Sequence, residues 1–441
     1  MASKNPRRLA FEILSRVERG AFASPLLASR RLEGLDARDR ALIHELVLGV
    51  LRNRNMLDHE LERYLKTPAK PLDPRVRNLL RIGLYQVRFL DRIPTHAAVN
   101  ETVGLAKEIG AEQAAGLANA VLRRAAREDA SATMAGLPAG AEGLSVRYSH
   151  PRWLVERWVA RWGFARAEAI LRADNETPAV FFFPIPVNEG PNSTLDAMRR
   201  AGLVVQPAMP PPGCWQLMDG PASALKGFAD KGAIYIMDRG AQWVAHLLRS
   251  ESGMRVLDLC AAPGGKSLAA AAHMKHEGAV IANDVRLTRL RTLLAVCRSA
   301  GILIIHALVS DPSSAIPFRP GLMFDRVLLD APCSGTGTLR RNPDLRWRIR
   351  RSEIKRLSDL QSRLLAECGP LVRPGGLLVY STCSMEPEEN EGVVEAFLRS
   401  SSGYGLLIPS LTDAIRDGPY FRTDPTMDLM DGFFAAVMMR Y

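Results

Sequence analysis

The sequence predicts a multidomain protein with an all-α N-terminal domain, a small α+β middle domain and a C-terminal α/β domain built on a doubly wound parallel sheet. Apolar residues recur at helical spacing up to about residue 130, small and flexible residue types fill 131–146, and apolar strands alternate with helical stretches from Asp238 onward. A chain of 441 residues is also too long for one ordinary core. We therefore expect domains over 1–130, 147–237 and 238–441, joined by a linker over 131–146.

The N-terminal domain is expected to consist of five to seven helices. Leu9, Ile13 and Val17 recur at intervals of four residues, and prolines at 68, 71, 74 and 94 fall where helices should end. Residues 1–128 carry 23 basic and 15 acidic side chains, which is most of the net charge of +11. This excess favours a polyanionic partner such as nucleic acid, and a solvated basic surface is the alternative.

The two later domains differ in regularity. In the middle domain a helix is expected to open at Ser149, and strand and helix signals follow in the segments 179–187, 193–201 and 202–206. The C-terminal domain alternates strand and helix more regularly, as a parallel sheet requires. Its strands are expected at 255–259, 279–283, 303–308, 326–329 and 376–380.

The chain shows no sign of secretion or membrane insertion. Its N-terminus lacks an apolar signal core and no later segment approaches the length of a membrane span, so we expect a cytoplasmic protein without a membrane partner. Six cysteines in 441 residues are too sparse for a disulfide scaffold, and their spacing resembles no zinc site. We read Cys297 and Cys368 as core residues of helices and place Cys214 in a loop.

A glycine loop over Asp258–Ser267 follows the first strand of the C-terminal domain. Gly264 and Gly265 allow the backbone to approach a ligand closely, and the helix that begins there offers unpaired N–H groups to a carboxylate or phosphate. The next strand ends at Asp284, about 20 residues further on, which is the spacing at which an acid reaches ribose hydroxyls. The loop therefore predicts a cofactor that contains a nucleoside.

Two further acids end strands of the same sheet. Asp311 follows the third strand, where it could meet an adenine amino group, and Asp330 ends the fourth. A single acid of this kind often only caps the next helix, but several in register are stronger evidence. The residues alone leave S-adenosylmethionine and a nicotinamide open as cofactors. The loop favours the former, because it is neither G-x-G-x-x-G nor a P-loop.

Two cysteines follow the ends of predicted strands. Cys333 lies in Asp-Ala-Pro-Cys and Cys383 in Ser-Thr-Cys-Ser, fifty residues apart. A thiol at a strand end is poised for covalent chemistry, whereas either cysteine alone would more often be a small buried hydrophobe. The pair in these contexts predicts an enzyme.

Three segments carry a resemblance to a known family: 259–266 (Leu-Cys-Ala-Ala-Pro-Gly-Gly-Lys), 330–337 (Asp-Ala-Pro-Cys-Ser-Gly-Thr-Gly) and 380–384 (Tyr-Ser-Thr-Cys-Ser). They resemble the signature segments of the RNA 5-methylcytosine methyltransferases of the Nol1/Nop2/Sun class, and the resemblance covers essentially all of 238–441. In the N-terminal domain, segments 92–107 and 117–124 resemble the NusB-type RNA-binding fold. The fusion of the two is typical of bacterial methyltransferases that act on small-subunit ribosomal RNA.

The resemblance implies a Rossmann-like class I methyltransferase domain that takes a methyl group from S-adenosylmethionine, and ribosomal RNA as partner. Cytosine C5 is too electron-poor to accept that methyl group directly, so a thiolate first adds at C6. In the family the cysteine of the Thr-Cys segment attacks and that of the Pro-Cys segment assists release. This carries over to Cys383 as nucleophile and Cys333 in elimination.

The resemblance also implies the remaining site residues. Asp330 would hydrogen-bond the cytosine edge, and Lys266 would lie beside the cofactor or the base. No metal is expected. The cofactor would be held by Cys260, Ala261, Ala262, Pro263, Gly264, Gly265, Lys266, Asp284, Asp311 and Asp330.

Basic and aromatic residues beyond the second segment could contact RNA. Arg340, Arg341, Arg346 and Arg348 could grip phosphates, and Trp347 could stack on a base or could equally be a packing residue. The target cytosine must leave its stack to reach a thiol, so a loop or an opened helix is expected as substrate.

Three other functions compete with methylation of small-subunit ribosomal RNA by a monomer. The first is the same chemistry on tRNA or large-subunit RNA. The second is a non-catalytic RNA-binding or antitermination factor with a vestigial methyltransferase fold, against which the intact cysteine pair and glycine loop argue. The third is a nicotinamide oxidoreductase, which would need the dinucleotide fingerprint that the glycine loop lacks.

Overall fold

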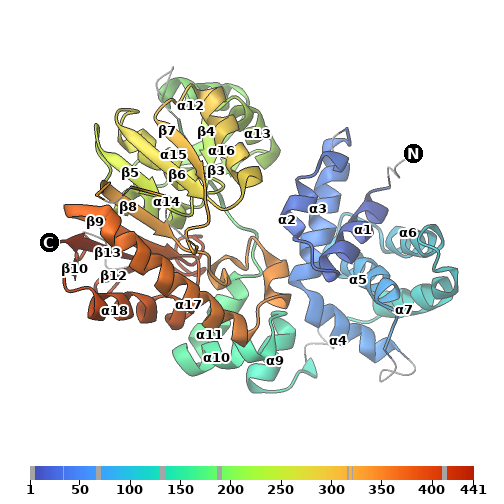
Figure 1. Ribbon diagram of the computed structural model, residues 1–441. Helices are drawn as coiled ribbons and strands as arrows, with labels where there is room; N and C mark the ends of the chain where they lie inside the picture. Colours follow the sequence, from blue (N-terminus) through green and yellow to red (C-terminus); the bar gives the residue numbers. More distant parts are fainter. Residues whose placement is uncertain are drawn as a thin grey trace. The chain divides into compact units, whose positions relative to one another are not determined.

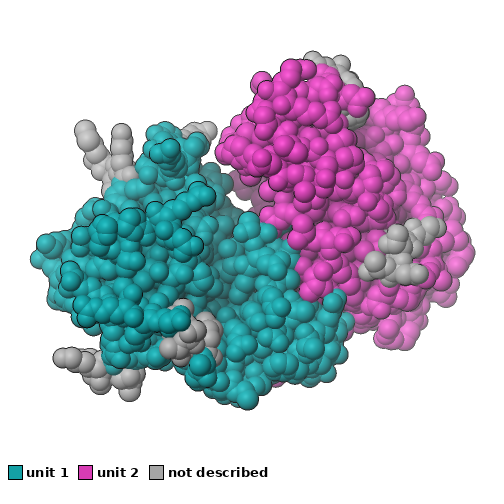
Figure 2. Space-filling view, turned by 180° about the vertical axis from the view of Figure 1, so that it is seen from behind, with its two compact units in different colours: residues 1–177, 339–348 teal, residues 178–338, 349–441 magenta. Residues whose placement is uncertain are grey.

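The computed structural model describes residues 5–32, 34–65, 71–129, 135–185, 191–314, 317–319, 321–409 and 415–441. They form two compact units (Figure 2). Unit 1 comprises the chain up to Thr177 together with Leu339–Arg348, and unit 2 comprises the rest. Unit 1 therefore contains a short segment that the sequence assigns to the C-terminal domain.

The N-terminal part of unit 1 is all helical, as predicted. Helix α1 shows how the sequence sets an element: Asn5 caps it by accepting from the Arg7 N–H at 3.0 Å, Pro6 opens it, and Leu9, Ile13 and Val17 are buried on one face. The α-helices described here are α1 (Pro6–Glu18), α2 (Ala23–Leu27), α3 (Ala37–Arg52), α4 (Arg54–Tyr64), α5 (Pro74–Phe89), α6 (Thr95–Glu108) and α7 (Ala115–Arg127).

Three more of the described helices belong to unit 1: α9 (Gly140–Arg147), α10 (Arg152–Trp162) and α11 (Phe164–Ala173). The linker expected over 131–146 therefore contains the start of a helix, because α9 begins at Gly140. Residues 130–134 lie outside the described part of the chain. Helices α10 and α11 belong to the span predicted as a separate middle domain, yet they join the helical unit. The predicted boundaries at 146 and 237 differ from the boundary between the two units, which falls after Thr177.

The small sheet of unit 2 is antiparallel, with strand order β2-β3-β1-β4. It accounts for the strand signals of the predicted middle domain, although part of the segment 179–187 lies outside the described residues. The elements are β1 (Val180–Pro184), α12 (Pro191–Arg200), β2 (Val204–Pro207), β3 (Trp215–Asp219), α13 (Ala222–Asp230) and β4 (Ile234–Ile236).

The large sheet of unit 2 has the order β11-β12-β13-β9-β8-β5-β6-β7, and β10 pairs with β13 (Figure 1). Strands β9, β8, β5, β6 and β7 are parallel, as predicted. The sheet as a whole is mixed, because β13 runs antiparallel to β9. Its strands are β5 (Arg255–Asp258), β6 (Ala279–Asp284), β7 (Ile305–Val309), β8 (Phe324–Asp330), β9 (Val372–Thr382), β10 (Tyr404–Leu406), β11 (Arg416–Asp417), β12 (Tyr420–Arg422) and β13 (Phe434–Arg440).

Helices cover both faces of this sheet, so successive strand residues enter different cores. Val256 packs in a cluster with residues of α14–α16, and Leu257 in a cluster with residues of α17 and α18. The helices are α14 (Arg239–Leu247), α15 (Gly265–His273), α16 (Leu287–Ala300), α17 (Arg351–Cys368) and α18 (Glu391–Ser400). None of the described helices in either unit combines the length and the apolar character needed to cross a bilayer.

Candidate active site

The parallel strands bring the predicted site residues to one edge of the large sheet. Strands β8 and β9 are neighbours with Asp330 opposite Ser381, so Cys333 and Cys383, which follow those strands, meet at their carboxyl ends. The glycine loop begins at the end of β5, the neighbour of β8 on the other side. Strand order therefore explains why segments far apart in the sequence form one site.

The two cysteines lie within hydrogen-bond distance of each other. Their Sγ atoms are 3.3 Å apart, and both side chains are partly buried. The hydrogen bond to Cys383 and burial raise the pKa of Cys333 well above the ordinary value of a thiol. Cys333 therefore keeps its proton and can act as a hydrogen-bond donor at neutral pH.

Asp330 is held between a lysine and a serine. Its Oδ2 accepts from Lys266 Nζ at 2.6 Å and its Oδ1 accepts from Ser381 Oγ at 2.8 Å. Burial alone would lower the pKa of Lys266, but the charge and hydrogen bond of Asp330 outweigh it and the pKa is raised. Lys266 Nζ also lies 5.3 Å from the centre of the Phe433 ring. The ammonium is thus charged and fixed at the edge of the site.

A buried carboxylate, Glu389, joins the two cysteine segments. It accepts from the Ser334 N–H at 2.9 Å, from Gln361 Nε2 at 3.0 Å and from the hydroxyls of Ser334 and Ser384. Ser334 directly follows Cys333, and Ser384 directly follows Cys383. Burial raises the pKa of Glu389, and its hydrogen bonds oppose that rise. No local pattern in the sequence predicts this role for Glu389.

The glycine loop is as tight as its residues predict. Gly264 has φ of +111°, and a Cβ there would lie 2.5 Å from Leu293 Cδ1. The loop is tied to the next strand, because the Ala262 N–H donates to Asp284 Oδ2 at 3.2 Å. Asp284 also accepts from the Arg286 N–H at 2.9 Å. The loop backbone and the acid predicted to bind ribose therefore form one connected unit.

Asp258 is a buried acid at the start of the same loop. Its Oδ2 accepts from Ser267 Oγ at 2.7 Å, while its Oδ1 has no hydrogen-bond partner within the described part of the chain. Burial raises the pKa of Asp258 to about 7, and the charge of Asp330 adds to the rise. An unpaired buried acceptor beside a glycine loop fits a site that receives a polar cofactor.

Other predicted residues lie apart from the cysteine pair. Asp311 follows β7, which is separated from β8 by two strands, and its carboxylate accepts from the Ser313 N–H and hydroxyl at 2.9 and 2.6 Å. Cys260 lies inside the glycine loop, where burial raises its pKa well above the ordinary value. Burial thus favours the protonated thiol of Cys260, and its role in the loop backbone stays a prediction.

The prediction that Arg340 and Arg346 grip phosphates is wrong. Both are fully buried in unit 1. Arg340 Nε donates to the Ala173 carbonyl at 2.9 Å, and Arg346 donates to the Asp174 carbonyl at 2.7 Å and to other backbone carbonyls of the unit. Trp347 packs against the helical core and donates from Nε1 to the Leu51 carbonyl at 3.0 Å. These residues anchor the segment Leu339–Arg348 within unit 1.

Known proteins resemble both the N-terminal and the C-terminal part of the chain. The family model described as 16S rRNA methyltransferase RsmB/F matches residues 245–439, and the NusB family model matches residues 4–127. Ribosomal RNA small subunit methyltransferase B of Cronobacter sakazakii is 34% identical, over 99% of both chains. The chain belongs to the RsmB family of 16S rRNA methyltransferases. The predicted family and enzyme class are thereby confirmed.

Other proteins are similar to this RsmB-family chain over most of its length. The enzyme of the same name from Pseudomonas putida is 37% identical and covers 90% of each chain. Among solved structures, PH0851 covers 100% of this chain and 99% of its own, with a TM-score of 0.83 at 24% identity. This last similarity shows that the whole fold is shared.

Proposed function

We propose that this protein methylates C5 of a cytosine in small-subunit ribosomal RNA through a covalent bond between Cys383 and C6 of the base. The observation that carries the proposal is the Sγ–Sγ distance of 3.3 Å between Cys383 and Cys333, beside the Lys266–Asp330 ion pair. The names of the relatives, which specify the small subunit, favour this RNA over tRNA and large-subunit RNA. We also expect a cytoplasmic monomer.

The cofactor would lie against the glycine loop and be held by residues 260–266 together with Asp284 and Asp311. The orphan acceptor of Asp258 and the tight backbone at Gly264 support this placement. When bound, S-adenosylmethionine supplies an electrophilic methyl group on a sulfonium.

The chain's own residues would carry the remaining chemistry. The Cys383 thiolate adds to C6, and the C5–C6 π electrons become available at C5 for transfer of the methyl group. Asp330, oriented by Lys266 and Ser381, holds the polar edge of the cytosine. A base then removes the C5 proton, the C5–C6 double bond re-forms and the Cys383 thiolate leaves. Cys333, the thiol that keeps its proton, assists that release.

Substitution of each cysteine separates these roles. Cys383→Ala is expected to abolish methyl transfer, and Cys333→Ala is expected to accumulate an enzyme–RNA adduct that survives denaturing electrophoresis. Cys297→Ala, in the core between α16 and the sheet, is the matched control and should do neither. An active Cys383→Ala enzyme, or a Cys333→Ala enzyme without adduct, would contradict the assignment.

Two measurements address the alternatives. Bisulfite sequencing of ribosomal RNA and tRNA, from cells with and without the gene, identifies the modified cytosine and its RNA. A titration with S-adenosylmethionine tests the non-catalytic RNA-binding factor, which would show no binding.

A further inference from the structure

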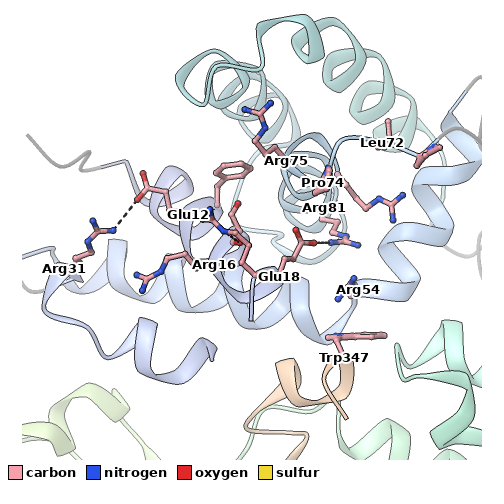
Figure 3. A pocket seen from close by; sticks show the side chains of 15 residues that line it. Glu12, Arg16, Glu18, Arg31, Arg54, Leu72, Pro74, Arg75, Arg81 and Trp347 are labelled. Carbon is pink, nitrogen blue, oxygen red and sulfur yellow. Dashed lines mark hydrogen bonds and ion pairs between the residues drawn. The ribbon is translucent and has the colours of Figure 1, made fainter. Parts of the chain in front are cut away.

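Unit 1 contains a wide pocket that the active-site chemistry does not use (Figure 3). It has a volume of about 1060 Å³ and lies between α1, the beginnings of α4 and α5, and Trp347. Binding sites for small molecules are roughly 300–1,000 Å³. This pocket is therefore large enough for a segment of a chain rather than a single ion.

The lining of the pocket is strongly basic. Seven arginines and two glutamates contribute to it. Arg81 is neutralised by Glu18 at 2.8 Å and by Asp58 at 2.6 Å, and Arg31 lies 3.8 Å from Glu12. By contrast, the side chains of Arg16, Arg54 and Arg77 form no hydrogen bond or ion pair with another residue of the described part of the chain. Arg19 bonds only to the Ser15 carbonyl, at 3.1 Å, so the excess positive charge of the pocket comes from these three arginines and Arg19.

Arg54 is the most constrained of the three. Its guanidinium carbon lies 5.0 Å from the centre of the Trp347 ring, and the side chain is partly buried. Burial and the nearby charge of Arg81 lower the pKa of Arg54, and the carboxylates of Asp58 and Glu18, which pair with Arg81, only partly oppose this fall. A guanidinium stacked on an indole keeps the N–H donors in its plane free, and that fork matches two oxygens of a phosphate.

The chemistry of the lining selects one class of ligand. Guanidinium groups beside an aromatic ring recognise the phosphodiester backbone and exposed bases of single-stranded RNA. An acidic peptide would satisfy the charge but would not need the aromatic wall that Trp347 and Phe11 supply. The excess of basic residues in the N-terminal helices points the same way.

We infer that this pocket binds a single-stranded segment of the RNA substrate, with phosphodiester groups held by Arg16, Arg54 and Arg77. The inference rests on the RNA methyltransferase function proposed above and adds a contact site to it. Trp347 and Cys333 lie in the same connection between β8 and α17. One stretch of chain thus carries both an active-site thiol and a wall of the RNA pocket.

The test measures binding of a labelled single-stranded RNA oligonucleotide to the full-length protein by fluorescence anisotropy at several salt concentrations. Arg54→Gln/Arg77→Gln removes two unpaired cations and leaves no carboxylate without its partner. Arg123→Gln is the matched control, because Arg123 is an exposed arginine of α7 outside the pocket. We expect the double variant to raise Kd roughly tenfold or more. The slope of log Kd against log salt should fall by about 0.7 for each lost contact. The control should leave both values unchanged.

Other outcomes would overturn the inference. Equal loss of affinity in Arg123→Gln would mean that general surface charge binds the RNA. Displacement of the RNA by inorganic phosphate or by polyglutamate at constant ionic strength would assign the pocket to a phosphate ion or an acidic peptide. Arg16→Gln/Arg77→Gln serves as a second variant, because neither residue stacks on Trp347. It should show the same loss of affinity even if Arg54→Gln disturbs folding.

Methyl transfer by the wild-type protein is measured in parallel. If it occurs and the double variant binds RNA like the wild type, the pocket inference fails and the proposed function stands. If the wild type binds RNA through the pocket but transfers no methyl group, the proposed function fails and the pocket remains.

Discussion

Replacement of Glu389 tests whether one buried carboxylate sets the position of both cysteines. Glu389 accepts four hydrogen bonds, and three of them come from the residues that directly follow Cys333 and Cys383. Glu389→Ala removes all four acceptor interactions at once. Ser334 Oγ and Ser384 Oγ lie 3.1 Å apart, so they can still bond to each other.

The size of the effect follows from the donors left behind. A buried donor without an acceptor costs about 1–3 kcal/mol. The Ser334 N–H loses its only acceptor and Gln361 Nε2 loses one of two, since it still donates to the Pro332 carbonyl at 2.8 Å. The serine hydroxyls re-pair, so the free energy of unfolding should fall by about 2–6 kcal/mol, which is about 1–3 kcal/mol for each lost interaction. A shift of about 1 Å in the segments that carry the thiols would lower the rate of methyl transfer by about 10²-fold.

The assay separates position from folding. Glu389→Gln keeps one acceptor oxygen, and its amide can donate to the serine hydroxyls, which rotate to accept. Compared with Glu389→Ala, it should therefore recover most of the lost stability and part of the lost rate of methyl transfer. Glu388→Gln, on the exposed neighbour in the same 3-10 helix, is the control and should match the wild type. We expect kcat to fall in Glu389→Ala while the affinity for S-adenosylmethionine stays the same, because Glu389 contacts the cysteine segments and not the glycine loop.

Two results would refute this reasoning. If Glu389→Ala forms the covalent RNA adduct at the wild-type rate, the carboxylate does not position the thiols. If it loses affinity for S-adenosylmethionine as much as it loses kcat, the damage is general unfolding of the unit rather than displacement of two segments.

Three further predictions concern the glycine loop and its neighbours. Lys266→Met should lower the free energy of unfolding by about 1–3 kcal/mol and abolish methyl transfer, because the half-buried Asp330 loses its cation. Urea unfolding and a methyl-transfer assay measure the two effects, and full activity of the variant would contradict the prediction. The raised pKa of Asp258 means that the folded state binds its proton more tightly than the unfolded state, so stability should fall by about 4 kcal/mol as pH rises from about 4 to about 7. Asp258→Asn should flatten this part of the pH profile in urea unfolding, and an unchanged profile would exclude Asp258 as its source. Gly264→Ala should destabilise the fold by about 1–3 kcal/mol, because the residue has a positive φ and a Cβ there would crowd Leu293. It should also weaken the binding of S-adenosylmethionine, which calorimetry measures. An affinity equal to that of the wild type would contradict a tight loop.

The fold was predictable where local pattern decides it. Helical spacing in the N-terminal part and strand–helix alternation after Asp238 correspond to the helices of unit 1 and to the parallel strands of unit 2. The C-terminal strands β10–β13 were not predicted. In β13 the residues form a continuous apolar run, because the strand is buried, and such a run lacks the alternation that identifies a strand in a sequence. The place of Leu339–Arg348 in unit 1 was also not predictable, since it depends on carbonyls such as that of Asp174, far away in sequence.

The candidate active site also has residues that the sequence predicts and residues that it does not. Strand ends and loop glycines are local signals, so Asp330, Cys333, Cys383 and Gly264 could be named from the sequence, and strand order then brings them together. Glu389 could not be named in this way, because no local rule tells a buried carboxylate from a solvated one. Its role depends on donors from Ser334 and Ser384, which only the folded chain brings near it.

The two thiols are unequal in a way that orders the proposed reaction. A hydrogen bond between two sulfur atoms needs one donor, and the raised pKa of Cys333 makes it the thiol that retains its proton. Cys333 then donates its proton in the hydrogen bond to Cys383, which leaves the sulfur of Cys383 available to attack C6. When the C6 bond breaks again, the same donor faces the departing sulfur, so Cys333 favours release. Removal of Cys333 should therefore slow elimination more than attack, and single-turnover kinetics that showed slower attack with unchanged release would reverse the two roles.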